Sequence, residues 1–322
     1  MRFVCSSLLS SIGFKSPGGQ GSKRTAQALE LSTPRILSLF RSYLCLCKAR
    51  ISFFAALSAA VGLCLSPQAS AASLVTVIVG VFLTACGGCA LNHWQEKDAD
   101  ALMERTAKRP IPAGRIEPDR AFVFAVLIVC SGVIVLFSIG AAATLLGLAA
   151  IIWYNGVYTW FKRRSAFAAI PGALVGAIPP AIGWIAGGGS ILDERLIAVS
   201  FFFFMWQVPH FFIHLLAFGK EYERARLPSL TAVFTESQLH RLTFQWMTAT
   251  AVSLQLVTFF GLMQSTLIQG FLLAVSLWLV SIGTSFMRTR EPAYASVFKK
   301  TNLFMLTVMI FIFAEKLPGF LL

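Results

Sequence analysis

Four acidic residues fall within nine positions of the stretch ALNHWQEKDADALMERTAKRPIP, residues 90–112. The chain has only 14 Asp and Glu among 322 residues, so its scarce negative charge is concentrated here. If an α-helix runs through this stretch, Asn92, Glu96 and Asp100 recur every four residues and lie on one face. Oxygen ligands spaced in this way suit Mg²⁺, which one or two carboxylates typically hold together with substrate phosphates. On spacing alone, a solvated loop of mixed charge is an equally good interpretation.

The three residues on this face, here called the oxygen ladder, are followed in the sequence by positively charged residues. On a continuous helix Asp98 points about 200° away from Glu96, so it joins the other oxygens only if the helix unwinds. Arg105, Lys108 and Arg109 come next. Such cations bind phosphate oxygens through charge-assisted hydrogen bonds, so the stretch offers both metal ligands and phosphate ligands.

Two further segments place polar groups beside apolar runs. Tyr158 is followed by Lys162 and Arg163, although cations at a helix end also serve as interfacial anchors. His210 and His214 lie four residues apart, hence on one helical face. Ionisable residues inside a membrane span are functional candidates, and these could ligate haem iron or transfer a proton. A histidine bonded to a neighbouring helix is the alternative interpretation.

Three other stretches also carry candidate functional groups. Residues 220–224, KEYER, form a second acidic and basic cluster that contains Glu221 and Tyr222. The stretch 176–184 contains two prolines and interrupts helical hydrogen bonding, which membranes tolerate where the freed backbone is buried or lines a cavity. The four phenylalanines at 201–204 could stabilise a substrate cation, and some of them could simply meet lipid.

The elements that position these residues are membrane-spanning helices. Apolar side chains make up 57% of the chain and charged ones 13%, and the mean hydropathy is +0.74, well outside the range of soluble domains. A span needs about 20 apolar residues, and sustained runs without apolar–polar alternation favour a helical bundle over a β-barrel. Nine spans are expected, at roughly 51–66, 73–92, 121–139, 141–159, 166–187, 196–218, 243–263, 266–287 and 301–315.

The net charge of +13 reflects membrane topology rather than a nucleic-acid partner. With nine spans, 25 of the 27 Lys and Arg fall on one side of the membrane, and only Arg195 and Lys316 fall on the other. This positive-inside bias places the N-terminus in the cytoplasm and the cationic side against anionic membrane lipid. Two long connections on that side, 93–120 and 219–242, hold nine of the 14 acids, and such connections usually carry function.

Three segments are expected along the chain. Residues 1–33 are rich in Ser, Lys and Arg and predict a disordered tail, with a transit peptide as the alternative. Residues 34–50 mix apolar and basic residues, as an interfacial amphipathic helix does. Residues 51–322 form the intramembrane domain. Within it, Cys86 and Cys89 flank two glycines, which favours close helix contact over a redox or metal-binding pair.

These motifs together resemble the protohaem IX farnesyltransferase branch of the UbiA-type intramembrane prenyltransferases. The order and spacing hold from about residue 45 to the C-terminus, and the first and last runs are the specific ones. The matching runs are Asn92-x3-Glu96-x-Asp98-x-Asp100-x2-Met103-x-Arg105-Thr106-x2-Arg109-Pro110, Tyr158-Thr159-x2-Lys162-Arg163, Gly176-Ala177-x-Pro179-Pro180-x2-Gly183-Trp184 and Trp206-Gln207-x-Pro209-His210-Phe211.

The resemblance implies an all-α polytopic membrane bundle of about nine transmembrane helices around a central cavity. It implies an Mg²⁺-dependent enzyme that transfers farnesyl from farnesyl diphosphate to a vinyl group of haem b, making haem O for terminal oxidases. Haem b is then a substrate, and haem A synthase or a terminal oxidase assembly is a further expected partner. The expected location is a bacterial inner membrane, with the mitochondrial inner membrane as the alternative.

The resemblance also implies roles for residues at matching positions. The expected catalytic residues are Asn92, Glu96, Asp100, Arg105 and Lys162, and the expected metal ligands are Asn92, Glu96, Asp100 and Glu221. The expected substrate-binding residues are Asp98, Arg109, Tyr158, Arg163, His210, His214, Glu221 and Tyr222. Relatives usually carry Asp at the positions of Glu96 and Glu221, a Gly-x-Pro-Met run near residues 226–229 and an Asn near Ala168. These departures leave room for altered substrate choice or weaker activity.

Three other functions fit parts of the sequence. One is prenylation of a quinone precursor or another aromatic acceptor. A secondary transporter would explain the spans, the broken helices and the intramembrane histidines, although the paired repeats typical of transporters are not evident. The third is an inactive relative that binds haem or assists oxidase assembly. Mg²⁺-dependent binding of farnesyl diphosphate that requires Glu96 and Asp100 separates the enzyme from the transporter.

Overall fold

The structure, a computed structural model, describes residues 35–289 and 292–321, and every regular element within them is helical. The tail predicted at residues 1–33 lies outside the described residues. The longer helices are α2 (Arg35–Leu46), α3 (Ala49–Leu65), α4 (Ala71–Gln95), α6 (Pro118–Phe137), α7 (Ala141–Ile151), α11 (Glu194–Arg224), α13 (Glu236–Phe259), α14 (Thr266–Arg288) and α15 (Tyr294–Leu321). The shorter pieces are α5 (Lys97–Leu102), η1 (Ile152–Tyr158), α8 (Thr159–Phe161), η2 (Ala166–Ala168), α9 (Ala169–Ala173), η3 (Leu174–Ala177), α10 (Ile178–Ala186) and α12 (Leu230–Val233).

The chain is an integral membrane protein, because its helices have the length and composition of membrane spans. Among the described residues, seven helices or helical runs qualify, and α2 with α3, bent by 51° where they meet, counts as an eighth. All nine predicted spans lie on helices. The remaining predicted span, 243–263, lies mostly on α13, which has 24 residues but is less apolar than the other spans. Its buried Thr243 and Thr250 donate hydrogen bonds to carbonyls one turn back, so these polar groups are satisfied within the helix.

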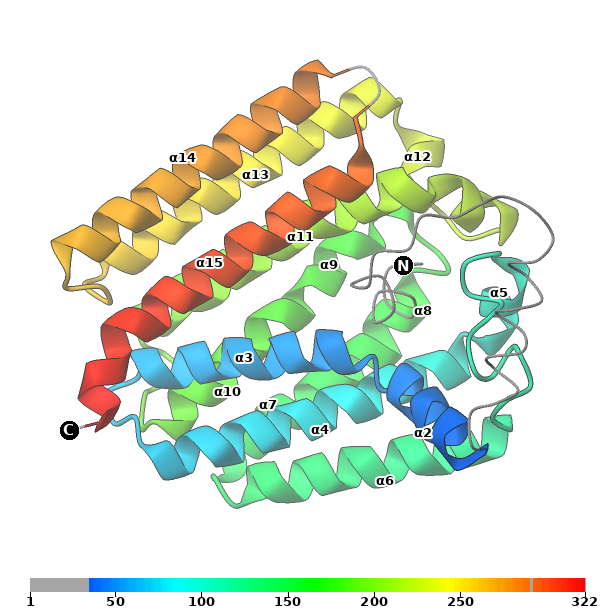
Figure 1. The fold of residues 1–322 in the computed structure, drawn as a ribbon, viewed down its shortest axis with the longest axis horizontal. Coiled ribbons are helices and arrows are strands. Elements are labelled where there is room, and N and C mark those ends of the chain that lie inside the picture. Colours follow the sequence, from blue (N-terminus) through cyan, green and yellow to red (C-terminus); the bar gives the residue numbers. More distant parts are fainter. Residues whose placement is uncertain (1–34, 290–291, 322) are drawn as a thin grey trace, which may run out of the picture.

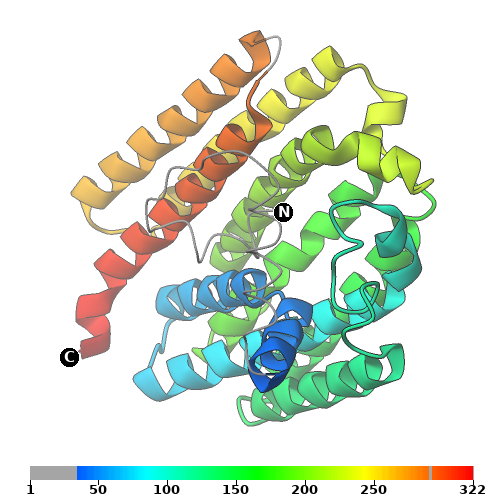
Figure 2. The same ribbon diagram turned by 45° about the vertical axis from the view of Figure 1, so that its right-hand side comes forward.

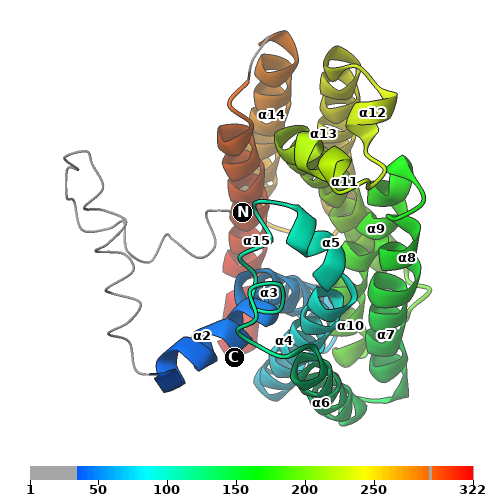
Figure 3. The ribbon, with the colours of Figure 1, turned by 90° about the vertical axis from the view of Figure 1, so that its right-hand side faces the viewer.

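The long helices lie side by side in a bundle (Figure 1). In one part α4 packs between α3 and α6, and α3 also packs against α10. In the other part α13 packs against α11 and α14, and α15 packs against α11 and α14. Figures 2 and 3 show α15 beside α3, and the contacts between these two helices join the two parts.

The largest apolar core among the described residues lies mainly between α11, α13, α14 and α15, and it reaches α3 and α10. Its fully buried aromatic side chains are Trp184, Phe202, Phe286 and Phe304. Phe203 packs in the same core, and Phe204 packs edge-on against Trp246. The phenylalanines at 202–204 therefore serve helix packing.

Irregular backbone interrupts the helices on the α2–α10 side. The π-helix η1 continues α7, and span five is divided into η2, α9, η3 and α10, with Pro179 in the first turn of α10. The predicted interruption of helical bonding in this span is confirmed. The close contact predicted at Cys86–Cys89 is also confirmed, since a Cβ on Gly87 would lie 2.5 Å from Cγ2 of Val129 in α6.

Candidate active site

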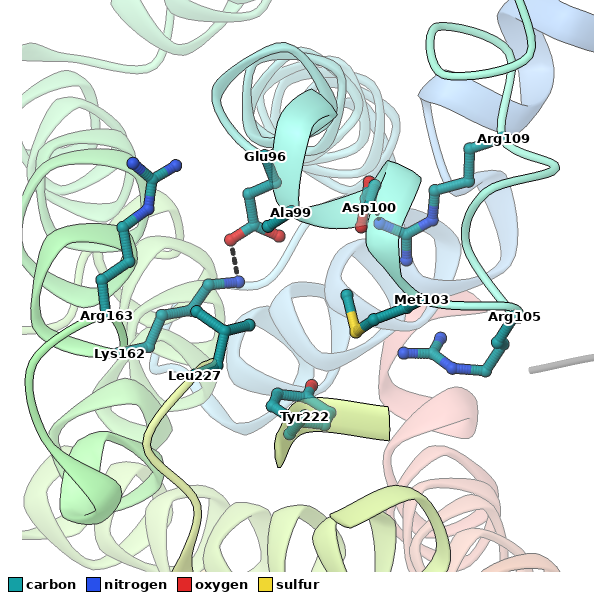
Figure 4. Close-up of a pocket in the computed structure, with 10 residues that line it drawn as sticks. All are labelled: Glu96, Ala99, Asp100, Met103, Arg105, Arg109, Lys162, Arg163, Tyr222 and Leu227. Carbon is teal, nitrogen blue, oxygen red and sulfur yellow. Dashed lines mark hydrogen bonds and ion pairs between the residues drawn. The ribbon is translucent and has the colours of Figure 1, made fainter. Parts of the chain in front are cut away.

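A small polar pocket lies where α4, α8 and α11 end, at the right-hand side of Figure 1. Figure 4 shows the ten residues that line it: Glu96, Ala99, Asp100, Met103, Arg105, Arg109, Lys162, Arg163, Tyr222 and Leu227. Seven of these are among the residues predicted for the site. The cavity is about 30 Å³, which leaves room for little more than water.

The predicted oxygen ladder survives a break in its helix. Although α4 ends at Gln95, the N–H of Glu96 donates to the carbonyl of Asn92 at 3.0 Å, and the N–H of Asp100 donates to the carbonyl of Glu96 at 2.8 Å. These one-turn bonds keep Asn92, Glu96 and Asp100 in register, and all three are buried. By contrast, the side chain of Asp98 is 90% exposed and pairs with Lys97 at 3.8 Å, so the structure does not bring it into the pocket.

Each carboxylate of the site pairs with a cation from another segment. Glu96 pairs with Lys162, which Figure 4 marks by a dashed line. Asp100 accepts a hydrogen bond of 2.6 Å from Arg109. Outside the pocket lining, Glu221 lies 3.7 Å from Nε of Arg105. Buried charges need such partners, because an unpaired one would be strongly destabilising.

The pocket lining is more cationic than acidic, with four cations and two carboxylates. Burial, together with the nearby charges of Lys48 and Arg163, lowers the pKa of Lys162 to about 7. Burial likewise lowers the pKa of the Arg105 guanidinium. Desolvated cations gain most from an anion. The arrangement can therefore bind a small polyanion once the internal ion pairs open.

One residue of this site is missing from the sequence prediction. Lys48 stands between α2 and α3, and its ammonium donates to Oδ1 of Asn92 at 3.1 Å and to the hydroxyl of Tyr154 at 3.5 Å. The sequence places Lys48 in a mixed apolar and basic segment, which predicts an interfacial helix. The feature of the sequence that could have indicated this role is a single lysine at the junction of two apolar runs.

A stack of aromatic rings leads away from the pocket. The π-helix η1 presents Tyr154 and Tyr158, whose ring centroids lie 5.9 Å apart and nearly parallel. Tyr158 stacks in turn on Phe211 of α11, at 6.2 Å. The ammonium of Lys162 lies 5.7 Å from the Tyr158 ring, so the stack begins at the pocket. Such a wall can stabilise a nearby cation through its ring faces.

The two histidines of α11 lie beyond the pocket lining. The His210 ring packs between Trp206, at 4.9 Å, and Phe298 of α15, at 4.5 Å. His214 packs on Phe218 at 4.9 Å. Arg105 lies 4.9 Å above the same Phe218 ring, so it links the histidines to the pocket. The aromatic stack also reaches them, since Phe211 follows His210.

A hydrogen-bonded amide pair fixes the π-helix against α4. Asn155 donates to the carbonyl of Gly88 at 3.0 Å and to Oε1 of Gln95 at 3.1 Å, and Gln95 donates back to the carbonyl of Asn155 at 3.0 Å. A Cβ on Gly88 would lie 2.9 Å from Ile151, so glycine permits this approach. Neither amide was predicted, because only the tertiary fold pairs them.

The donor set fits Mg²⁺ that substrate phosphates would complete. Among the described residues, no three His, Cys, Asp or Glu side chains are close enough to hold a metal ion by themselves. The site does supply an amide oxygen from Asn92 and buried carboxylates from Glu96 and Asp100. Mg²⁺ prefers oxygen ligands and typically takes one or two carboxylates plus substrate phosphates.

Sequence comparison connects this site to known proteins. The model of the UbiA prenyltransferase family matches residues 52–308. A protoheme IX farnesyltransferase of Geobacter sulfurreducens is 39% identical over 223 residues, which cover 69% of this chain and 83% of that relative. A protoheme IX farnesyltransferase of Oleidesulfovibrio alaskensis is 31% identical over 281 residues, which cover 87% of this chain and 98% of that relative.

Solved structures share the fold. A UbiA homologue from Archaeoglobus fulgidus, bound to GPP and Mg²⁺, matches with a TM-score of 0.68 at 17% identity, over 85% of this chain and 99% of that one. An apo UbiA homologue from Aeropyrum pernix matches with a TM-score of 0.70 at 18% identity, over 84% and 98%. At these identities the likeness establishes the helical bundle and nothing finer.

Proposed function

This chain belongs to the UbiA prenyltransferase family, and we propose that it transfers a farnesyl group from farnesyl diphosphate to a vinyl carbon of haem b, making haem O. The relatives of this sequence that carry the name protoheme IX farnesyltransferase support the choice of acceptor. The observation that carries the reaction type is the pocket itself, in which four cations and two carboxylates meet the start of an aromatic wall.

In this proposal the pocket binds the diphosphate. Arg105, Arg109 and Lys162 exchange their internal carboxylate partners for phosphate oxygens, through charge-assisted hydrogen bonds. The freed carboxylates of Glu96 and Asp100 would then be available to hold Mg²⁺. Mg²⁺ bound there would supply further positive charge to the departing diphosphate. The cavity of about 30 Å³ requires this exchange, because a diphosphate does not fit beside the closed ion pairs.

The reaction breaks the bond between the first farnesyl carbon and the diphosphate oxygen. The electron pair leaves with the diphosphate, where the cations stabilise the negative charge as it develops. The resulting allylic cation lies along the ring faces of Tyr154 and Tyr158. The electron pair of the haem vinyl group then forms the new carbon–carbon bond at the outer vinyl carbon, which moves the positive charge to the inner vinyl carbon. A water molecule adds to that carbon and loses a proton, which leaves a hydroxyl group there and completes the hydroxyethylfarnesyl side chain.

The haem acceptor is proposed to lie beside α11 and α15. His210 and His214 face the aromatic rings of Trp206, Phe218 and Phe298 there. A flat macrocycle suits such aromatic surroundings, and imidazole suits haem iron. Phe211 connects this region to the diphosphate pocket through its stacking on Tyr158.

The membrane setting follows from the same proposal. We place the protein in a bacterial inner membrane with its N-terminus in the cytoplasm, supported by the positive-inside charge pattern and by bacterial relatives. Haem A synthase or a terminal oxidase assembly would receive the product. Asp98 remains a candidate substrate ligand only if it turns inward when substrate binds.

The test is turnover by the purified full-length protein with farnesyl diphosphate and Mg²⁺. Haem b and a 4-hydroxybenzoate acceptor are offered in parallel, and EDTA removes the metal. We expect a farnesylated haem, no product from the aromatic acid, and loss of activity with EDTA. Farnesylation of the aromatic acid alone would replace haem b with a quinone precursor as the acceptor.

A further inference from the structure

Lys48 occupies a backbone position that does not favour lysine. It follows the end of α2 with φ 44° and ψ 49°, a left-handed conformation. Only Lys48 and Arg226 combine a positive φ with a side chain among the described residues. Glycine is the usual residue at such helix ends, because any Cβ is strained there. A non-glycine residue held in this conformation suggests a functional use of its side chain.

The Lys48 ammonium is directed at one oxygen of the site. It donates to Oδ1 of Asn92 at 3.1 Å. The other end of that amide is fixed, since Nδ2 of Asn92 donates to Thr159 at 3.3 Å and Thr159 donates to the carbonyl of Tyr154 at 2.9 Å. Asn92 therefore presents its oxygen, the atom that would bind a metal, to Lys48.

The same pairing occurs at every position of the ladder. Glu96 pairs with Lys162, and Asp100 pairs with Arg109. The three cations come from three separate segments: the α2–α3 junction, the residue after α8, and the connection between α5 and α6. Lys162 and Arg109 each neutralise a carboxylate, whereas Lys48 donates a hydrogen bond to the uncharged amide of Asn92. All three occupy a proposed metal ligand in the substrate-free protein, so Lys48 stands in the same relation to the ladder as two of the cations assigned to the diphosphate.

We propose that Lys48 is a substrate-contacting residue, whose ammonium leaves Asn92 and donates to a diphosphate oxygen when the prenyl diphosphate and Mg²⁺ bind. This inference rests on the proposed function. The bend between α2 and α3 carries the ammonium to Asn92, one helical turn before Glu96 of the pocket lining, so the strained backbone serves substrate binding.

The experiment measures binding of farnesyl thiodiphosphate, a slowly reacting analogue, to the full-length protein in nanodiscs with Mg²⁺. Lys48→Met keeps the chain length and removes the ammonium, Lys48→Arg keeps a cation, and Lys48→Gly removes the ammonium while relaxing the left-handed backbone. Loss of one charge-assisted hydrogen bond predicts a Kd at least about tenfold higher for Met and Gly. Arg should stay within about threefold of wild type. Lys97→Met, which removes a partly exposed lysine outside the pocket lining, is the matched control.

Two further measurements separate substrate contact from a structural role. Thermal unfolding should leave Lys48→Gly at least as stable as wild type, so a weaker Kd in that variant reports the lost ammonium. In an Asn92→Ala background, Lys48→Met should weaken binding again. If the second substitution has no effect there, Lys48 only positions Asn92 and the proposal is overturned. Wild-type Kd values in Lys48→Met and Lys48→Gly would also overturn it, whereas a wild type that binds no analogue refutes the proposed function itself.

Discussion

Buried polar groups are satisfied in two different ways in the two parts of the bundle. In α13 and α15, Thr243, Thr250 and Thr301 donate to the carbonyl one turn back in their own helices. At the pocket, Glu96 and Asp100 pair with cations that lie outside their own helices, Lys162 after α8 and Arg109 in the connection between α5 and α6. The threonine hydroxyls are bonded within their own helices and offer no partner that a ligand could replace. The second kind forms a site, because its partners can be exchanged for a substrate.

The backbone differs in the same way. The helices α13, α14 and α15 are unbroken over 24, 23 and 28 residues. On the pocket side, a left-handed residue, a π-helix and two 3-10 turns interrupt the helices. Irregular backbone of this kind costs stability and is tolerated where it positions functional groups. The comparison predicts that substitutions at the pocket change the reaction, whereas substitutions in α13 and α14 change stability.

The largest effect on the reaction is expected for Asp100→Asn. This change leaves Arg109 without its charged partner and removes a proposed metal ligand. A metal ligand contributes several kcal/mol of transition-state charge stabilisation, so its loss should lower kcat/KM by about two to three orders of magnitude. Asp98→Asn is the control, since that side chain is exposed, and it should remain within about threefold of wild type. Equal losses in both variants would remove the distinction between the ladder and its exposed neighbour.

The second-largest effect is expected at Lys162, where the KM for farnesyl diphosphate should depend on pH. The pKa of Lys162 is about 7 in the substrate-free protein, so its ammonium predominates below that pH and is lost above it. KM for farnesyl diphosphate should therefore rise as the pH increases from about 6 to about 8. Lys162→Arg should flatten this rise, because arginine keeps its charge over that range. An unchanged pH profile in Lys162→Arg would show that Lys162 is not the titrating group.

A third and smaller effect, on kcat, is expected for Tyr158→Leu. A cation–π contact contributes about 1–2 kcal/mol when desolvated, so kcat should fall by about tenfold while KM for farnesyl diphosphate changes little. Tyr158→Phe keeps the ring face and should retain most of kcat. A loss as large in Phe as in Leu would point to the hydroxyl group and away from the aromatic wall.

The smallest effect on the reaction is expected in α14. Leu279 is fully buried there, and Leu279→Ala should lower the free energy of unfolding by about 2–5 kcal/mol. The kcat/KM of the folded fraction should stay unchanged, as judged by activity normalised to folded protein from size-exclusion chromatography. A selective loss of turnover in this variant would contradict the division between the two parts.

The sequence predicted what depends on local spacing. The spans, the one-turn ladder of Asn92, Glu96 and Asp100, and the interruption in span five all follow from helix geometry and composition. Partners far apart in the chain could not be predicted in this way. The pairing of Lys48 with Asn92 depends on a 51° bend that brings a lysine 44 residues away to the first residue of the ladder.

Resemblance supplied roles but not contacts. It implied a catalytic role for Lys162 and a substrate-binding role for Arg109, whereas the structure gives their partners in the closed pocket as Glu96 and Asp100. Their grouping in one pocket depends on how α4, α8 and α11 end together, which no single segment encodes.

The central claim is tested most directly by the haem composition of bacterial cells that lack haem O synthase and express this chain. We predict a haem whose mass exceeds that of haem b by one farnesyl group and one hydroxyl group, and its absence when Glu96→Gln is expressed at the same level in the membrane. Haem b alone, in cells whose membranes contain the folded wild-type protein, would contradict the account.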